Sequence, residues 1–170
     1  VQLRKALPAI VEHEGPVYIR LFRRQAENVF DDDYEFDLGK ADLLRDGSDV
    51  TLIASGVCVA NALQAAETLA QEGVSARVLN IHTIKPIDAD AVIKAASETG
   101  ALVTAENHNV IGGLGSAVAE VLAEQRPTPL ERVGVKDHFG QVGKAPYLMG
   151  VFGITAADIA KAARKAIARK

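Results

Sequence analysis

Residues 101–116, which read ALVTAENHNVIGGLGS, decide the fold. The stretch begins with Ala101–Ala105, whose small, apolar and β-branched residues are typical of a buried strand. It then passes through polar residues into the glycine-rich turn Gly112–Ser116. Beyond the turn, apolar residues recur at helical spacing with glutamates off the stripe: Leu114, Ala117, Val118, Val121 and Leu122. This order of strand, turn and helix predicts one unit of an α/β fold.

Three other stretches of the chain have the same strand-like composition: Val50–Ala54, Ala76–Ile81 and Leu130–Val135. Segments with helical periodicity lie between and after them, and the last begins with Thr155 and Asp158, which resemble a capping box. Lys40–Leu44 is predicted to add an antiparallel edge strand. We therefore predict the α/β class, with a mostly parallel, mixed five-stranded sheet covered by helices on both faces.

The first 36 residues do not follow this rhythm. A helical start extends to His13, Gly15-Pro16 interrupts it, and Val17–Phe22 is predicted to form a strand. We interpret residues 1–37 as the end of a preceding domain plus a linker, and residues 38–170 as the main domain. Because the chain begins at Val1 and its only methionine is Met149, we expect it to be a piece of a longer polypeptide.

Composition restricts the classes of protein to consider. The net charge is −3 with both signs scattered along 170 residues, which argues against a dedicated nucleic-acid surface. No apolar run is long enough to span a bilayer and no signal peptide opens the chain, so we expect a cytoplasmic protein without membrane contact. The single cysteine, Cys58, excludes an internal disulfide and is predicted to be a buried structural residue.

The polar turn after Ala105 allows two interpretations. Its glycines and the following helix N-terminus could cradle a phosphate, or they could simply permit tight strand-to-helix packing, which we favour. The spacing Gly-Gly-x-Gly does not match the dinucleotide fingerprint. Glu106 and His108 could form an acid/base pair, but no nucleophile or metal partner accompanies them in the sequence. We therefore assign no catalytic, cofactor-binding or metal-binding residue within this chain.

A family resemblance covers nearly the whole chain. Residues 106–120 resemble the hallmark of the C-terminal domain of transketolases, deoxyxylulose phosphate synthases and the beta subunits of 2-oxoacid dehydrogenases. Asn80–Asp88 resembles the adjoining motif of that thiamine diphosphate-dependent superfamily. Val135–Gly140, followed by Gly153–Thr155, is similar to the closing segment of transketolases in particular. The motifs occur in the family's order, which makes the set specific.

The resemblance also implies roles for the arginines near the N-terminus. It places Val1–Arg24 at the end of a pyrimidine-binding domain, where the family has an arginine that binds the substrate phosphate. Arg23 is the first choice for this role, and Arg24 is the second because Arg24-Gln25 also matches a transketolase pattern. A guanidinium suits phosphate through its planar fork of donors. Without the resemblance, Arg20, Arg23 and Arg24 would be interpreted as a solvated strand end.

For the parent protein, the resemblance implies an enzyme of the pentose phosphate pathway that transfers a two-carbon ketol unit between sugar phosphates. It implies thiamine diphosphate and Mg²⁺ bound upstream of Val1, and either a homodimer or a partner N-terminal subunit. The present piece would then pack in the dimer and be inactive alone. The alternatives are a fragment of a 2-oxoacid dehydrogenase beta subunit or of deoxyxylulose phosphate synthase, a purely structural dimerisation domain, or a nucleotide-binding module using Gly112–Ser116.

Overall fold

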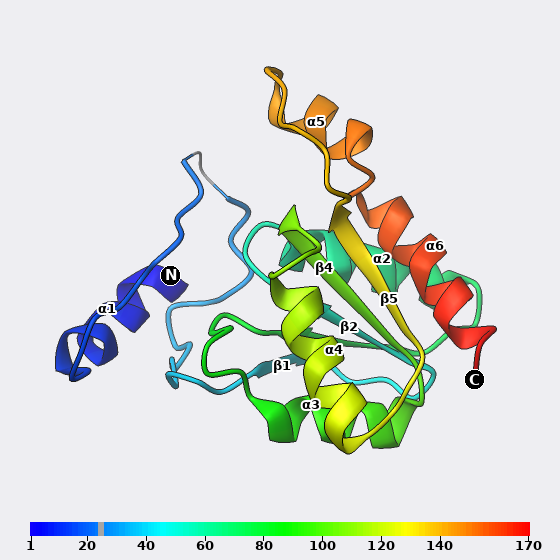
Figure 1. Ribbon diagram of the computed structural model, residues 1–170, viewed down its shortest axis with the longest axis horizontal. Helices are drawn as coiled ribbons and strands as arrows, with labels where there is room; N and C mark the ends of the chain where they lie inside the picture. Colours follow the sequence, from blue (N-terminus) through cyan, green and yellow to red (C-terminus); the bar gives the residue numbers. More distant parts are fainter. Residues whose placement is uncertain (24–25) are drawn as a thin grey trace.

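A five-stranded mixed sheet forms the centre of the protein (Figure 1). The computed structural model describes residues 1–23 and 26–170. The strand order is β1-β3-β2-β4-β5, with β1 antiparallel to β3 and the other neighbours parallel. The predicted α/β class and mixed five-stranded sheet are thus confirmed. The strands are β1 (Asp42–Arg45), β2 (Val50–Ala54), β3 (Ala76–Asn80), β4 (Leu102–Asn109) and β5 (Leu130–Val135).

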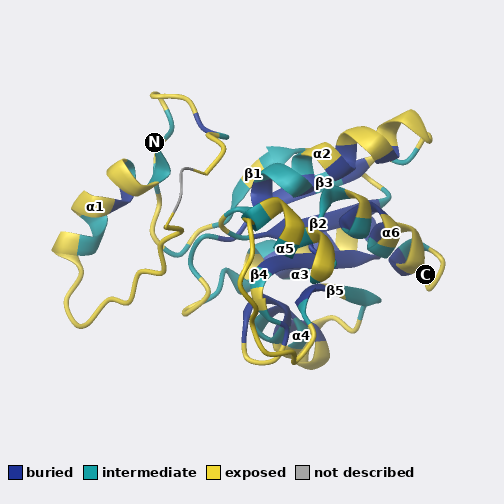
Figure 2. Cartoon of the chain, turned by 90° about the horizontal axis from the view of Figure 1, so that it is seen from above, coloured by how far each residue is buried: buried dark blue, intermediate teal, exposed yellow. Residues whose placement is uncertain are grey.

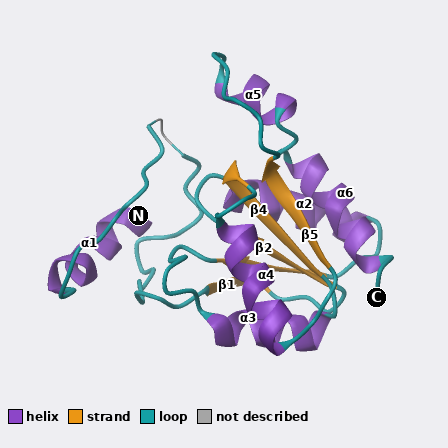
Figure 3. Cartoon of the chain, viewed as in Figure 1, coloured by secondary structure: helices purple, strands orange, loops and turns teal. Residues whose placement is uncertain are grey.

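Helices cover both faces of the sheet (Figure 3). On one face, α2 (Cys58–Gln71) and α6 (Ala156–Ile167) pack over a core that includes Leu52 and Val103. On the other face, α3 (Ala89–Thr99) and α4 (Leu114–Gln125) pack over a second core that includes Ile53. Because successive strand residues point to opposite faces, strands buried on both sides read as continuous apolar runs, as β2 does.

The chain reverses its direction across the sheet between β2 and β4. It leaves β2 through α2 to reach β3 on one side, and then crosses through α3 to β4 on the other side of β2. The carboxyl ends of β2 and β4 are adjacent, since Ala54 pairs with Ala105 and the Ser55 amide donates to the Ala105 carbonyl at 3.2 Å. In open α/β sheets this switch point is the place where ligands usually bind.

The N-terminal part lies beside the sheet and is largely exposed (Figure 2). It contains α1 (Gln2–Glu12) and then an irregular segment. The predicted strand Val17–Phe22 is wrong for this structure, because no described residue pairs with that segment and a strand requires a hydrogen-bonding neighbour. The Tyr34 hydroxyl donates to Asp42 at 3.0 Å, which joins the following loop to β1.

The last part of the chain forms a projecting arm and then the closing helix. The arm contains α5 (Ala145–Val151) and stands away from the sheet in Figure 1, with Phe139 and Val142 fully exposed. The predicted capping box of α6 is confirmed: the Asp158 amide donates to the Thr155 hydroxyl at 3.3 Å, and the Thr155 amide donates to the Asp158 carboxylate at 3.0 Å. None of the described helices has the length and hydropathy that crossing a membrane requires.

Candidate functional site

The carboxylate of Glu106 occupies the N-terminus of α4, at the carboxyl end of β4. One carboxylate oxygen accepts from the Leu114 amide and the other from the Gly115 amide, each at 2.8 Å. The side chain is almost fully buried. A helix N-terminus stabilises an anion through its free amides and its dipole. Here the protein supplies that anion itself, so these two donors are already used and the phosphate-cradle interpretation loses its ligand groups.

The glycines of the turn make room for this carboxylate. A Cβ on Gly113 would collide with the Glu106 carboxylate and lie 2.9 Å from the Asn109 carbonyl oxygen. Gly113 has a φ of −104°, which any residue can adopt, so its role is to allow the close approach of Glu106. The residue that does adopt a positive φ, of 76°, is Gly112. The glycines of this turn therefore allow tight strand-to-helix packing, which is the interpretation favoured from the sequence.

The structure does not bring Glu106 and His108 together. Glu106 points inward to α4, while His108 is exposed and its Nδ1 donates to the Asn109 carbonyl at 2.9 Å. In a regular strand, residues two apart, such as Glu106 and His108, would point to the same side of the sheet. The pairing of β4 with β5 shifts register between Ala105 and Asn109. The arrangement gives no hydrogen-bonded acid/base pair.

Cys58 lies at the start of α2, facing the same end of the sheet, and is buried as predicted. The pKa of the Cys58 thiol is raised to about 12, mainly by burial and also by the Glu106 carboxylate, while Arg20 acts in the opposite direction. A thiol that stays protonated is a poor nucleophile. Cys58 is therefore a structural core residue.

The candidate phosphate-binding arginines lie on the irregular N-terminal segment. Arg20 donates from its two terminal nitrogens to the Asn107 side-chain oxygen at 2.8 Å and to the Asn107 carbonyl at 3.0 Å. Arg23 lies three residues further along and is exposed. Arg24 falls outside the described residues. The structure thus attaches Arg20, and with it the N-terminal segment, to the carboxyl end of β4. The roles of Arg23 and Arg24 stay predictions.

A second polar cluster lies at the carboxyl end of β3, beyond the residues that the sequence suggested. Asp42 accepts from the Asn80 amide group at 2.8 Å and from the Tyr34 hydroxyl. His82 lies beside it, with its Nε2 4.0 Å from the Asp42 carboxylate and without a hydrogen-bond partner among the described residues. Burial lowers the pKa of His82, and the charges of Asp42 and Asp37 oppose that change.

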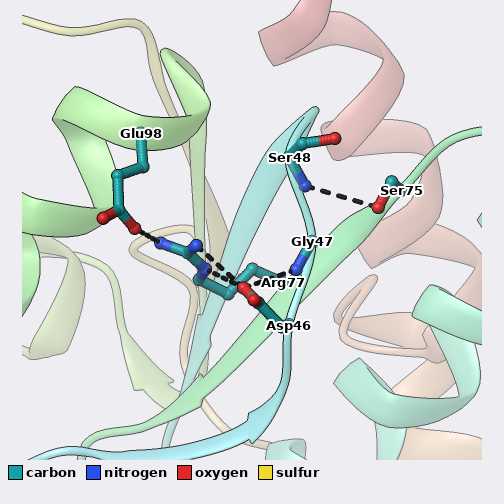
Figure 4. Close-up of a pocket in the computed structure, with 6 residues that line it drawn as sticks. All are labelled: Asp46, Gly47, Ser48, Ser75, Arg77 and Glu98. Carbon is teal, nitrogen blue, oxygen red and sulfur yellow. Dashed lines mark hydrogen bonds and ion pairs between the residues drawn. The ribbon is translucent and has the colours of Figure 1, made fainter.

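A shallow depression lies at the other end of the sheet, where the parallel strands begin, and its lining residues form ion pairs (Figure 4). Arg77 donates to Asp46 through Nε at 3.0 Å and through Nη2 at 2.8 Å, and it also pairs with Glu98. The Gly47 amide and then Arg77 lower the pKa of Asp46. With its donors engaged and its place at the amino ends of β2 and β3, this network is interpreted as structural.

Thiamine diphosphate and its metal would require carboxylate or imidazole ligands and donors to a phosphate. Residues 1–23 and 26–170 contain no cluster of three or more His, Cys, Asp or Glu side chains that could hold a metal ion. The amides at the start of α4, which could have held a phosphate, bind Glu106 instead. The expected location of the cofactor site upstream stays a prediction.

Sequence reasoning missed the contact between Arg20 and Asn107 and the role of Glu106. A carboxylate placed just before a glycine-rich helix start was the available signal for Glu106, since such a residue can fold back onto the helix amides. No signal in the sequence pairs Arg20 with Asn107, because the two residues are 87 positions apart.

Fold and site together define a class of protein: an α/β domain in which a glutamate of its own binds the helix N-terminus after β4, preceded by an exposed segment that carries arginines. Within that class the chain belongs to the transketolase family, since residues 39–159 match the family model described as transketolase, C-terminal domain. The resemblance inferred from the sequence is thereby confirmed.

Curated relatives include parts of transketolases that are encoded as separate subunits. The chain is 57% identical over 169 residues to the 6-deoxy-6-sulfo-D-fructose transketolase subunit of Clostridium sp. (strain MSTE9), covering 99% of this chain and 52% of that protein. It is 41% identical to an apulose-4-phosphate transketolase subunit of Phocaeicola vulgatus (strain ATCC 8482), covering 95% of this chain and 52% of the relative. The chain therefore spans about half the length of these relatives.

Solved structures agree with this assignment. A split-gene transketolase, described as an inactive beta4 tetramer, superposes with a TM-score of 0.94 at 47% identity, covering 97% of this chain and 54% of that one. A transketolase from Leishmania mexicana superposes with a TM-score of 0.58 at 23% identity, covering 77% of this chain and 18% of that one, which shows the shared fold.

Proposed function

We propose that this chain supplies the C-terminal part of a transketolase that transfers a two-carbon ketol unit between sugar phosphates. The observation that carries the proposal is that nearly the entire chain matches about half of relatives that are themselves named transketolase subunits. The remaining part of the enzyme would come from upstream sequence and from a partner subunit that holds the catalytic centre. This chain would pack in the assembled enzyme and contribute an arginine to substrate binding.

The proposed division of the chain follows the fold. Residues 38–170 would form the C-terminal domain, and residues 1–37 would belong to the end of the pyrimidine-binding domain and its linker. The exposed apolar residues of the N-terminal part support this proposal, because they would gain cover from the rest of such a domain: Leu7, Val11, Val17, Tyr18 and Leu21.

The chemistry would be divided between cofactor and protein. Thiamine diphosphate, anchored through a divalent metal, would supply the carbanion chemistry in the complete enzyme. The part proposed for this chain is binding: Arg23 would pair with the oxyanion at the far end of the sugar and so orient the substrate. Arg24 is the alternative for that role. Neither arginine is proposed to touch the reacting carbon.

A second candidate activity is favoured by another set of relatives. The chain is 39% identical to 1-deoxy-D-xylulose-5-phosphate synthase 1 of Geobacter sulfurreducens (strain ATCC 51573), over 99% of this chain and 27% of that protein. The transketolase subunits resemble the chain more closely and match its length better. Detection of 1-deoxy-D-xylulose 5-phosphate as the product of the complete enzyme would favour the synthase.

The role of Arg23 is tested by comparing Arg23→Ala with Arg24→Ala in the complete enzyme. Each variant is assayed with a phosphorylated, a sulfonated and an uncharged sugar. Loss of one charge-assisted hydrogen bond should raise the KM for the phosphorylated sugar by about 10-fold to 100-fold. The kcat should change less, because the contact would be similar in the ground and transition states.

The uncharged sugar is the internal control, since it offers no oxyanion to the guanidinium. If Arg23→Ala weakens charged and uncharged sugars equally, or neither, its assignment to the substrate phosphate is wrong. If Arg24→Ala alone shows the selective effect, the role belongs to Arg24. If no two-carbon transfer is found with the complete enzyme, a purely structural role for this domain gains support.

A further inference from the structure

Arg20 ties the N-terminal segment to the sheet domain. Its two terminal nitrogens both donate to Asn107, one to the side-chain oxygen at 2.8 Å and the other to the main-chain oxygen at 3.0 Å. Within residues 14–23, no other side chain hydrogen-bonds to residues 38–170, as far as the described parts of the chain go. A two-point contact fixes the direction of a planar guanidinium as well as its position.

Asn107 is a firm anchor for this contact. It lies within β4, directly after Glu106, whose buried carboxylate is bound to the first turn of α4. Two residues later, Asn109 pairs with Val135 of β5. The Arg20 guanidinium is therefore held by a part of the fold that is fixed on both sides of Asn107.

The charge of Arg20 is also placed to act on this end of the sheet. The Cys58 thiol at the start of α2 is influenced by Glu106 and by Arg20 in opposite directions. Both charges are thus close to one buried group. Arg20 lies over the end of β4 that carries the Glu106 carboxylate, which makes an arginine at this position more favourable than a neutral side chain.

Arg20 and Arg23 are close enough for one to position the other. Three residues of extended chain span at most about 10–11 Å, so a fixed Arg20 limits where the Arg23 backbone can lie. The segment between them has no sheet partner among the described residues, and an untethered segment would have to be ordered when substrate binds. Ordering in advance lowers that cost.

We propose that the contact between Arg20 and Asn107 is a positioning clamp, which holds residues 20–23 against the carboxyl end of β4 and so presents Arg23 to the oxyanion of the substrate. The inference rests on the proposed function, because it gives the clamp a purpose only if Arg23 binds substrate. Arg20 acts through Arg23 and is a positioning residue.

The test is a double-mutant cycle in the complete enzyme with Arg20→Ala, Asn107→Ala and the double variant. For the phosphorylated sugar, Arg20→Ala should raise KM about threefold to 10-fold, which is less than a direct charge contact because the clamp is exposed. Asn107→Ala should have a smaller effect, since the main-chain oxygen remains. The double variant should be no worse than Arg20→Ala alone.

Two conservative variants and one control sharpen the result. Asn107→Asp keeps an acceptor for Arg20 and should retain the parental KM, whereas Arg20→Lys can reach only one of the two oxygens and should be intermediate. Arg4→Ala removes another exposed contact of the N-terminal part, the ion pair with Asp32, and should leave both sugars unaffected. The KM for the uncharged sugar should not change in any of these variants.

Each of the following outcomes would overturn the clamp. Additive effects in the double variant, or a selective effect of Arg20→Ala with none from Asn107→Ala, would mean that Arg20 meets the substrate directly. Equal losses with charged and uncharged sugars would indicate a structural contact only. If Arg23→Ala and Arg24→Ala both lack a selective effect, the proposed arginine role fails first and the clamp fails with it. A selective Arg23→Ala with silent Arg20 and Asn107 variants rejects the clamp alone.

Discussion

Gly113 leaves the space that a buried carboxylate needs to reach the first amides of α4. The Glu106 carboxylate needs the space that a Gly113 side chain would fill, and it is the only anion that the first amides of α4 receive within the described residues. A displaced carboxylate would be a buried charge without its hydrogen bonds. Burying an unpaired charge is among the most expensive changes in a folded protein.

We expect Gly113→Ala to lower the free energy of unfolding by about 2–3 kcal/mol, through lost hydrogen bonds to Glu106. Gly112→Ala is the matched control: a Cβ there meets no atom within 4 Å, and its cost is the positive φ alone, about 1–2 kcal/mol. Urea unfolding measures both. An equal loss from Gly113→Ala in a Glu106→Ala background would show that the carboxylate is not the reason.

His82 predicts a specific dependence of stability on pH. Its pKa is lowered by burial, so the folded state binds a proton less readily than the unfolded state. Below the ordinary histidine pKa of about 6.5, the unfolded state therefore gains protons first, and the free energy of unfolding must fall with pH. The contribution is complete above that pKa and is lost as the pH decreases through the folded value.

We expect His82→Gln to flatten the decrease in stability below about pH 6.5, measured by urea unfolding at several pH values. His13→Gln, the same change at an exposed histidine of the N-terminal part, is measured beside it for comparison. A parental slope in His82→Gln would mean that other groups govern this range. The charged groups that act on His82 are Asp42 and Asp37, and Tyr34 hydrogen-bonds to Asp42.

Asp88 shows how one side chain joins two elements. One carboxylate oxygen accepts from the Ala91 amide at 3.1 Å and caps α3, and the other accepts from the Ala41 amide at 3.0 Å, just before β1. The edge strand and the helix are therefore attached to the same residue. This accounts physically for the aspartate that ends the motif Asn80–Asp88.

We expect Asp88→Ala to destabilise the protein by about 1–2 kcal/mol, because a helix cap and a second hydrogen bond are lost together. Asp90→Ala is the matched comparison: Asp90 lies in the first turn of α3, where its charge favours the helix by about 0.3–1 kcal/mol. Thermal unfolding compares the two variants. If Asp90→Ala costs as much as Asp88→Ala, the hydrogen bonds of Asp88 are not the source of its effect.

The chain taken whole has a domain core and an extended part with little cover of its own. The sheet and its helices bury two clusters of apolar side chains, whereas residues 1–23 are mainly exposed (Figure 2). Such a division suits a polypeptide that completes its packing against other parts of an enzyme.

We expect the isolated chain to show no saturable binding of thiamine diphosphate in the presence of Mg²⁺ and no ketol transfer. The reason is that the helix amides suited to a phosphate are bound to Glu106. Calorimetry with cofactor and metal tests the binding, and the complete enzyme serves as the positive control. Saturable binding in the micromolar range by this chain alone would contradict the expectation.

The order of strands and helices, the mixed sheet and the cap at Thr155 follow from local patterns. Buried strands such as Val50–Ala54 read as apolar runs, and helices show their stripe within three or four turns, so neighbouring residues carry the information. The family resemblance belongs here too, because its motifs are short and lie in a fixed order. These features were correctly predicted.

Local patterns could not predict three features of the structure. These are the irregular course of Val17–Phe22, the space that Gly113 leaves for a carboxylate, and the contact between Arg20 and Asn107. Strand formation needs a partner that local composition does not reveal. A glycine provides space only in relation to an atom that folding brings near it, here the carboxylate of Glu106. The Arg20 contact joins residues 87 positions apart. Local periodicity thus determined the elements, whereas the tertiary structure decided which side chains meet, because those contacts form only when distant segments pack together.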